Sequence, residues 1–349
     1  MGTHRKGAGR KVKRGFIAVM NFIRRHRRSI LVTTLSLILI TPFVLAVWSG
    51  LEIASPARRE LMDYHREYLT FPETHGIRID SFTASDGTPC LVCAPSGNAG
   101  ERGVKIRKQL EERGVAIPAF GKIVGTLVLC HGRKGRKEDY LPIAERFCAA
   151  GFRCVIPDLP AHGDHPDDIA TFGIRESTLP TKMLYEASRK FGFDTQPVGL
   201  MGMSMGGSVA MHAADLPDAP WKALVVVSSF DSLASVVNEQ ACKRAGKHLG
   251  SLWAKTSAMV YHQKTGIRLK EIQPRNHAMW LTIPSLIAHG TADRVVPITN
   301  GKRLFATLPT STTKKWVEIP GADHDNVLIT DFPIYSEIAE WMLRNVATH

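Results

Sequence analysis

The stretch PVGLMGMSMGGSVAMHAA, Pro197 to Ala214, decides how this chain folds. Its first part is apolar, its centre reads Gly-Met-Ser-Met-Gly, and its last part consists of helix-forming residues. This order predicts a buried strand, a sharp turn and a helix, with Ser204 exposed at the tip of the turn. Gly202 and Gly206 lack a Cβ where the strand and the helix must approach closely.

The predicted helix after the turn also has a chemical consequence. It begins near Met205, and the free N–H groups of its first turn point back toward Ser204, where they favour negative charge. A serine presented in this way is typical of nucleophiles that attack carbonyl carbons. A lone G-x-S-x-G pattern also occurs by chance in small-residue turns, so the other strand ends must support this interpretation.

Length and charge limit the possible functions. The 349 residues suffice for one large α/β domain and an additional segment. The net charge of +13 is concentrated at the start, because residues 1–28 contain ten Lys and Arg and no acidic residue. The rest has 35 basic against 32 acidic residues and no basic stripe interleaved with aromatics. We therefore predict no nucleic-acid partner.

A possible membrane segment follows the basic arm. ILVTTLSLILITPFVLAVW, Ile30 to Trp48, has 19 residues without a charge and as a helix would span about 28 Å. A cleaved signal peptide fits less well, because no small-x-small cleavage site follows. Residues 29–50 are therefore expected to be a retained, single-pass signal anchor. The ten basic residues before it, against Arg58 and Arg59 after it, predict a cytoplasmic N-terminus and an extracytoplasmic domain, periplasmic or at the cell surface.

The remaining chain divides into a stalk and one domain. Residues 51–74 are expected to form a charged stalk, and residues 75–349 the α/β domain. Within the domain, residues 96–122 are expected to be a surface insertion with a short helix, and residues 231–283 a helical, lid-like excursion over the site. Five apolar residues of the excursion either line an acyl pocket or pack as ordinary core: Leu249, Leu252, Trp253, Met259 and Tyr261.

The order of elements in the domain indicates its architecture. After an opening hairpin within residues 76–95, short apolar runs alternate with helical segments as far as residue 346. Such alternation predicts an α/β fold with a mainly parallel sheet of about eight strands and helices on both faces. The site is expected at the carboxyl ends of the strands.

Three further strand ends carry polar residues. One apolar run ends in His131-Gly132-Arg133, a second leads into HGTADRVVP with Asp293, and a third into GADHDN with His324. Together with Ser204 they give the chain order Ser, Asp, His. Over about residues 75–349 the chain thus resembles the α/β-hydrolase-fold serine hydrolases, in particular the esterase, lipase and serine-aminopeptidase-like branch.

The resemblance implies a role for each residue. Ser204 would be the nucleophile and His324 the base that takes its proton, since the only other histidine after Asp293 is the C-terminal one. Asp293 would orient the imidazole, with Asp231, at another strand end, as the alternative acid.

The oxyanion hole would be formed by the backbone N–H groups of Met205 and Arg133. Four cations lie in the RKGRK stretch, residues 133–137. They form either a patch that favours an anionic substrate or an ordinary solvated loop.

The leading hypothesis is an enzyme that cleaves carboxylic esters, small or lipid-like, through an acyl-enzyme on Ser204. It requires no metal and no organic cofactor. An aminopeptidase, an amidase or a thioesterase would use the same three residues, and the fold does not separate these activities. A catalytically silent binding protein of the same fold is the alternative from a different class.

Six cysteines add little chemistry. Cys90 and Cys93 form a C-x-x-C on a predicted strand, where residues three apart point to opposite faces, so a redox or metal site is not expected there. Cys148 and Cys154 either form a disulfide across a helix-to-strand turn or remain buried thiols.

Overall fold

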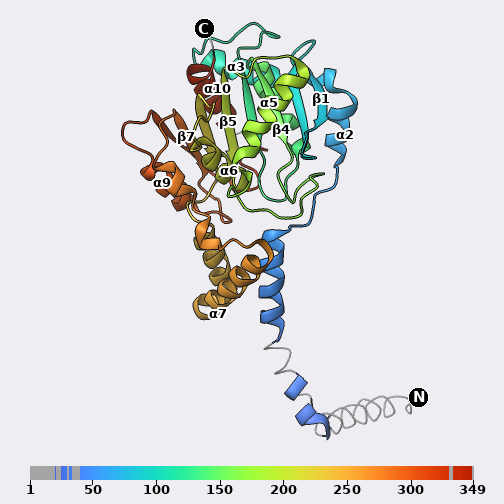
Figure 1. The fold of residues 1–349 in the computed structure, drawn as a ribbon, viewed down its shortest axis with the longest axis vertical. Coiled ribbons are helices and arrows are strands. Elements are labelled where there is room, and N and C mark those ends of the chain that lie inside the picture. Colours follow the sequence, from blue (N-terminus) through green and yellow to red (C-terminus); the bar gives the residue numbers. More distant parts are fainter. Residues whose placement is uncertain (1–19, 21–24, 30, 34–39, 330–332, 348–349) are drawn as a thin grey trace, which may run out of the picture.

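The computed structural model describes residues 20, 25–29, 31–33, 40–329 and 333–347. They contain one eight-stranded sheet with the strand order β1-β2-β4-β3-β5-β6-β7-β8 (Figure 1). Strand β2 is antiparallel to both of its neighbours, and the strands from β4 to β8 run parallel, which confirms the predicted mainly parallel sheet. The strands are β1 (Ile77–Thr83), β2 (Pro89–Pro95), β3 (Gly125–Cys130), β4 (Phe152–Pro157), β5 (Val198–Met203), β6 (Ala223–Val227), β7 (Ser285–Gly290) and β8 (Lys314–Ile319).

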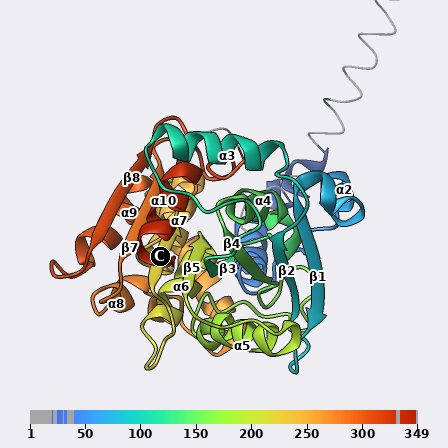
Figure 2. The same ribbon diagram turned by 90° about the horizontal axis from the view of Figure 1, so that it is seen from above.

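Helices cover both faces of the sheet, as Figure 2 shows for α3 and α5 on opposite sides. Every residue of β3 and β6 is buried, which explains why these strands are continuous apolar runs in the sequence. One apolar core lies between the sheet and α5 and α6, and the other between the sheet and α3, α4 and α10. The helices are α3 (Glu101–Glu112), α4 (Leu141–Ala149), α5 (Leu179–Phe191), α6 (Met205–Ala214), α9 (Ile298–Thr307) and α10 (Ile334–Asn345).

The insertion at residues 96–122 is more than a surface loop. Its helix α3 begins at Glu101, and in it Leu110 is fully buried and Ile106 is 1% exposed. An added Cβ at Gly103 would lie 3.0 Å from the Cβ of Ala149 in α4, so the two helices are in close contact. The apolar residues at helical spacing make this insertion an additional layer of the core.

Residues 51–74 are not a free stalk. The helix of residues 40–54 ends here, and α2 (Asp63–Thr70) and a short 3₁₀ helix (Pro72–His75) follow against the domain. His65 in α2 is fully buried and Tyr68 nearly so. The many charges of this segment had predicted exposure, but several of them have partners on the domain, as described below.

The helical excursion is dominated by α7 (Leu233–Thr265), which bends at Gly246 where φ is 74°. A second short helix, α8 (Pro274–Ala278), leads back to the sheet. Helix α7 lies beside the helix of residues 40–54 at the carboxyl edge of the sheet (Figure 1). Trp253 Nε1 donates to Ser49 Oγ over 3.0 Å, and Ser257 Oγ donates to the Ala46 carbonyl over 2.9 Å.

Three of the five apolar residues of α7 neither line a pocket nor pack as core. Leu249 and Leu252 are both 62% exposed and Met259 is 54% exposed, so these three side chains lie on the outer surface. Tyr261 is fully buried and is part of the core. Helical spacing shows which residues share a face, but it does not show whether that face points to the site, to the core or to solvent.

Part of the predicted membrane span lies outside the described residues, namely residue 30 and residues 34–39. In the portion of the chain that the structure describes, none of the helices combines the length and the apolar character needed to cross a bilayer.

The cysteines are free thiols, and Cys148 and Cys154 are not joined by a disulfide. Cys90 and Cys93 belong to the cores on opposite faces of the sheet, as the strand periodicity predicted. Burial raises the pKa of both thiols, so neither favours the reactive thiolate.

Candidate active site

Ser204 occupies the turn between β5 and α6. Its backbone has φ 53° and ψ −115°, a conformation that residues other than glycine rarely adopt. An added Cβ at Gly202 would lie 2.0 Å from the Gly206 carbonyl oxygen, and one at Gly206 would lie 2.1 Å from the Cys130 carbonyl oxygen. The steric requirement inferred from the G-x-S-x-G pattern is thereby confirmed.

This crowding predicts a large effect on stability. Replacing Gly206 by alanine should lower the free energy of unfolding by at least about 3 kcal/mol, because the neighbours of the new methyl group are backbone atoms that cannot rotate away. Gly192→Ala is the control, because Gly192 has φ 68° but no atom within 4 Å of its added Cβ. It should cost only about 1 kcal/mol of left-handed strain. Equal costs in urea unfolding would show that steric crowding at the turn is unimportant.

Two loops at the carboxyl ends of β7 and β8 carry Asp293 and His324. The loops are bonded to each other, because Ala292 N donates to the Ala322 carbonyl over 2.9 Å and Gly321 N donates to Thr291 Oγ1 over 2.9 Å. This pairing continues the parallel contact of the two strands. It explains why residues 31 positions apart in the sequence meet.

The structure brings Ser204, His324 and Asp293 together in one chain of hydrogen bonds. His324 Nε2 lies 3.0 Å from Ser204 Oγ, and His324 Nδ1 lies 2.7 Å from Asp293 Oδ2. Ser204 is only 8% exposed, so it is more buried than the exposed turn tip that the sequence predicted. The side chain of Asp293 is fully buried, while that of His324 is 13% exposed. A base within reach of a hydroxyl, itself held by a carboxylate, is the arrangement that activates a serine nucleophile.

Asp293 is held in its ionised form. Burial favours the neutral carboxylic acid, but hydrogen bonds from His289 and His324 outweigh burial, and the pKa of Asp293 lies well below its usual range. The second oxygen accepts from Val295 N over 3.0 Å and from Val296 N over 2.8 Å. The carboxylate is therefore charged at neutral pH and cannot rotate freely.

Two other aspartates, Asp323 and Asp231, do not contact His324 as its acid partner. Asp323 Oδ1 accepts from the backbone N–H groups of Asp325 and Asn326, so it shapes the loop that carries His324. Asp231, the alternative acid, lies elsewhere: its two oxygens each accept from Arg303 over 2.8 Å. Its position at a strand end was correct, but its carboxylate is used in an ion pair.

The two segments that carry the predicted oxyanion donors meet at Ser204. Met205 begins α6, so its N–H has no helical carbonyl to bond. Arg133 lies in residues 131–139, here called the oxyanion loop. Gly132 brings this loop to the serine, since its added Cβ would be only 3.6 Å from Ser204 Cβ. His131 is fully buried, and its Nε2 accepts from Leu159 N over 3.0 Å, which fixes the start of the loop.

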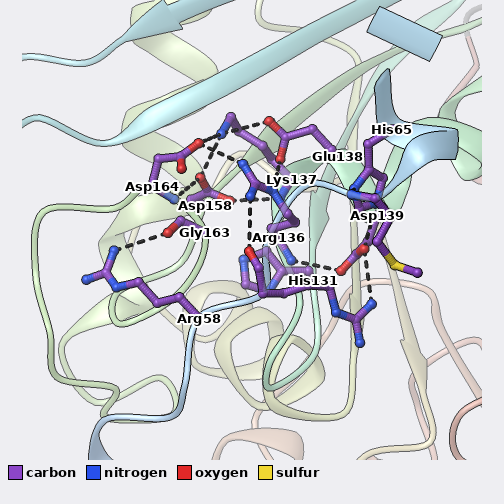
Figure 3. Close-up of polar contacts among 12 residues, drawn as sticks. Arg58, His65, His131, Arg136, Lys137, Glu138, Asp139, Asp158, Gly163 and Asp164 are labelled. Atoms are coloured by element: carbon purple, nitrogen blue, oxygen red, sulfur yellow. Dashed lines mark hydrogen bonds and ion pairs between the residues drawn. The ribbon is translucent and has the colours of Figure 1, made fainter. Parts of the chain in front are cut away.

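Arg136 and Lys137, two of the four cations in residues 133–137, belong neither to a solvated loop nor to an open patch for an anionic substrate. Figure 3 shows Arg136 and Lys137 among Glu138, Asp158 and Asp164. Lys137 Nζ lies 2.9 Å from Asp158 and 2.7 Å from Asp164, while Arg136 lies 2.5 Å from Glu138 and 2.8 Å from Asp164. Both cations are nearly buried. Because a buried charge needs a partner, this network holds the loop in one path.

Buried histidines beside the loop predict a dependence of stability on pH. Burial, together with nearby His131, lowers the pKa of His162 to about 3. Below about pH 6.5 the unfolded chain therefore binds more protons than the folded chain. The free energy of unfolding then falls as the pH is lowered from about 6.5 toward about 3, by up to about 1.4 kcal/mol per pH unit. Urea unfolding of His162→Gln between pH 6.5 and 4.5 should show a shallower slope than the unsubstituted protein.

The matched control for this measurement is His248→Gln, since His248 is exposed on α7. Its slope should equal that of the unsubstituted protein. A His162→Gln slope that also stays unchanged would mean that His162 carries none of the acid sensitivity.

The structure also contains a cavity of about 480 Å³. Ser204, Asp293 and His324 are not among its lining residues, and most of its lining is polar, including Asp86, Arg175 and Lys182. The lining of this cavity contains no serine, so the cavity offers no nucleophile of the predicted kind.

One contact near the site, between Arg133 and Glu52, has no signal in the sequence. Arg133 Nη2 donates to the Glu52 carbonyl over 2.6 Å and lies 3.3 Å from the Glu52 carboxylate. Glu52 is 81 positions away in a segment expected to be a stalk. No local pattern predicts such a pair.

A parallel sheet that carries a serine on a strained turn and a histidine–aspartate pair on neighbouring strand ends defines the class of the α/β hydrolases. A model of the Alpha/beta hydrolase family matches residues 127–333. This match covers more than half of the chain, which therefore belongs to that family and is a hydrolase.

Relatives of known sequence include a lipase. The chain is 23% identical over 227 residues to a thermostable monoacylglycerol lipase of Bacillus sp. (strain H-257), covering 61% of this chain and 88% of the lipase. It is also 23% identical over 219 residues to the uncharacterized protein YfhR of Salmonella typhi, covering 59% of this chain and 67% of YfhR.

Solved structures show the same fold at low identity. An esterase of Pyrococcus furiosus superposes with a TM-score of 0.58 at 15% identity, over 84% of this chain and 99% of the esterase. An acylaminoacyl peptidase of Pyrococcus horikoshii gives 0.57 at 15% identity, over 83% of this chain but only 45% of the peptidase.

Proposed function

We propose that this hydrolase cleaves carboxylic esters through an acyl-enzyme on Ser204. The observation that carries the proposal is the bond chain from Ser204 Oγ through His324 to Asp293, with spacings of 3.0 and 2.7 Å. Both distances permit proton transfer and orientation without rearrangement.

Each residue has a defined task in the proposed reaction. As Ser204 Oγ attacks the carbonyl carbon, His324 Nε2 takes its proton, and Asp293 stabilises the imidazolium through Nδ1–H. The oxyanion that forms is bound by the N–H groups of Met205 and Arg133. His324 then gives the proton to the leaving alcohol, and water releases the acid from the serine by the same steps in reverse.

The choice of ester over amide rests on the relatives. The match with this chain covers 88% of the length of the lipase. The match with the peptidase covers only 45% of the length of the peptidase. We therefore take monoacylglycerols and simple acyl esters as the first substrates to test. Aminopeptidase or amidase activity on the same residues is the second candidate, because the fold accommodates both.

Two assays test the proposal and separate the candidates. Fluorophosphonate should label the protein, and Ser204→Ala should abolish the labelling. Ser208→Ala is a control, because Ser208 lies one helical turn after Ser204 and its hydroxyl donates to the Phe172 carbonyl. p-Nitrophenyl esters of increasing chain length should be hydrolysed faster than aminoacyl-nitroanilides. Preference for the anilides would favour a peptidase, and a protein that is neither labelled nor active would be a silent binding protein.

We further propose that residues 29–50 anchor the protein in a membrane, with the N-terminus cytoplasmic and the domain outside. The basic arm and the charge-free sequence support this. So do the exposed side chains of Phe43, Val44 and Trp48 on the helix of residues 40–54. This helix lies beside α7, which exposes Leu249 and Leu252.

The anchor predicts where the protein is found and which part is accessible. The full chain should stay in the membrane fraction after alkaline carbonate washing, and protease outside intact cells or spheroplasts should digest the domain but spare the basic arm. A mature N-terminus after about residue 50 would instead indicate a cleaved signal peptide. Protection of the domain would reverse the proposed orientation.

A further inference from the structure

The segment that precedes the domain contacts the oxyanion loop at both of its ends. At the start of the loop, Glu52 binds two consecutive cations. Its carbonyl accepts from Arg133 over 2.6 Å, and its carboxylate lies 3.3 Å from Arg133 and 2.8 Å from Lys134. The Glu52 side chain is only 16% exposed and that of Arg133 30%, so solvent screens this pair less than a fully exposed one.

At the end of the loop, Asp139 is held by the same segment. Its Oδ1 accepts from Tyr64 over 3.0 Å, lies 2.9 Å from His65 Nε2 and 3.1 Å from Arg59. Figure 3 shows His65 against Asp139. In addition, Arg136 donates to the Arg59 carbonyl over 3.0 Å. The loop that carries one oxyanion donor is thus held between Glu52 and α2.

Glu52 itself has a fixed position. It lies near the end of the helix of residues 40–54, which packs closely on α7. An added Cβ at Gly50 would be 2.6 Å from the Ser257 carbonyl oxygen and 2.7 Å from the Val260 Cβ, so the two helices are in direct contact there. A rigid helix end can set the position of a loop that it binds, whereas a flexible stalk cannot.

We infer that Glu52 is a positioning residue of the active site: through Arg133 it sets the place of the Arg133 backbone N–H that receives the oxyanion. The inference rests on the proposed function, in which that N–H is a donor. The helix before the domain is then part of the catalytic unit as well as its connection to the N-terminal arm. Because an oxyanion donor acts mainly in the transition state, its displacement should lower kcat with little change in KM.

The test compares full-length variants in detergent, with the number of active sites titrated by fluorophosphonate. Glu52→Gln keeps the size of the side chain but removes its charge. We expect kcat per titrated site to fall by about tenfold, with KM changed less than about twofold. Arg133→Lys keeps the charge but lacks the planar fork that holds the Glu52 carbonyl and carboxylate together, and it should show the same loss or a larger one.

A boronic acid provides the readout that a merely structural role would not affect. It forms a tetrahedral adduct on the serine with an oxygen in the oxyanion hole, so its affinity should fall by the same factor as kcat. The Glu340→Gln variant is the matched control. Glu340 pairs with Arg113 over 2.5 Å, with side-chain exposures of 13% and 32%, close to those of Glu52 and Arg133 but between α10 and α3. It should keep kcat and boronate affinity.

The outcomes separate the two proposals. If Glu52→Gln and Arg133→Lys match Glu340→Gln in kcat per site and in boronate affinity, Glu52 does not position the oxyanion loop. If either variant folds poorly, titration restricts the comparison to its folded sites, and the other variant gives a second measurement. If the unsubstituted protein is neither labelled nor active on esters, the proposed function fails, whatever the role of Glu52.

Discussion

Replacing Ser204 by alanine should lower kcat for ester hydrolysis by about 10⁶-fold, as for serine hydrolases of similar design. His324→Ala should have an effect of similar size, because the hydroxyl 3.0 Å from Nε2 then has no base. The double variant should be hardly worse than either single one, since the two groups act as a unit and the remaining oxyanion donors and binding contacts supply what activity is left.

Controls keep this result specific. His277→Ala removes a histidine that lies 2.8 Å from Asp215, a pair of similar length to that of His324 and Asp293 but outside the site. Its activity per folded molecule should be unchanged. If the losses in the two single variants multiply in the double variant, Ser204 and His324 do not work together and the assignment of the base is wrong.

Replacing Asp293 by asparagine should lower kcat by about 10⁴-fold, less than the loss of the serine or the histidine. The amide presents no charge to stabilise the imidazolium. Its NH₂ group can also favour the wrong tautomer of His324, whose Nδ1–H in the unsubstituted protein donates to the carboxylate over 2.7 Å. The variant should fold, because the change is isosteric and the second oxygen can still accept from Val295 and Val296.

Asp231→Asn is the matched comparison for the acid. Asp231 is 2% exposed and Asp293 6%, and each carboxylate has a basic partner, Arg303 in the first case and His324 in the second. We expect Asp231→Asn to reduce stability by weakening the pair with Arg303 while kcat stays near its original value. A larger loss of activity in Asp231→Asn than in Asp293→Asn would move the acid to position 231.

Much of the fold could be predicted because its signals are local. A strand buried on both faces is a continuous apolar run, so β3 and β6 are visible in the sequence, and their alternation with helices predicts a parallel sheet. The glycines around Ser204 are required by contacts within a few residues or with an adjacent strand. Because parallel strands end at one edge, residues after their ends were expected to meet there, and Ser204, Asp293 and His324 do lie together.

Side-chain directions and long-range partners were decided only by the tertiary structure. Leu249 and Leu252 are apolar at helical spacing, but α7 turns them to the outer surface, where they are 62% exposed. Arg136 and Lys137 look like a solvated cationic patch until Asp158 and Asp164 are brought to them by the neighbouring strand. Glu52 reaches Arg133 across 81 positions because the helix of residues 40–54 packs on α7. Such pairs depend on how whole helices and strands pack against one another. Periodic patterns in the sequence report only local structure, so they do not reveal contacts between residues that are distant in sequence.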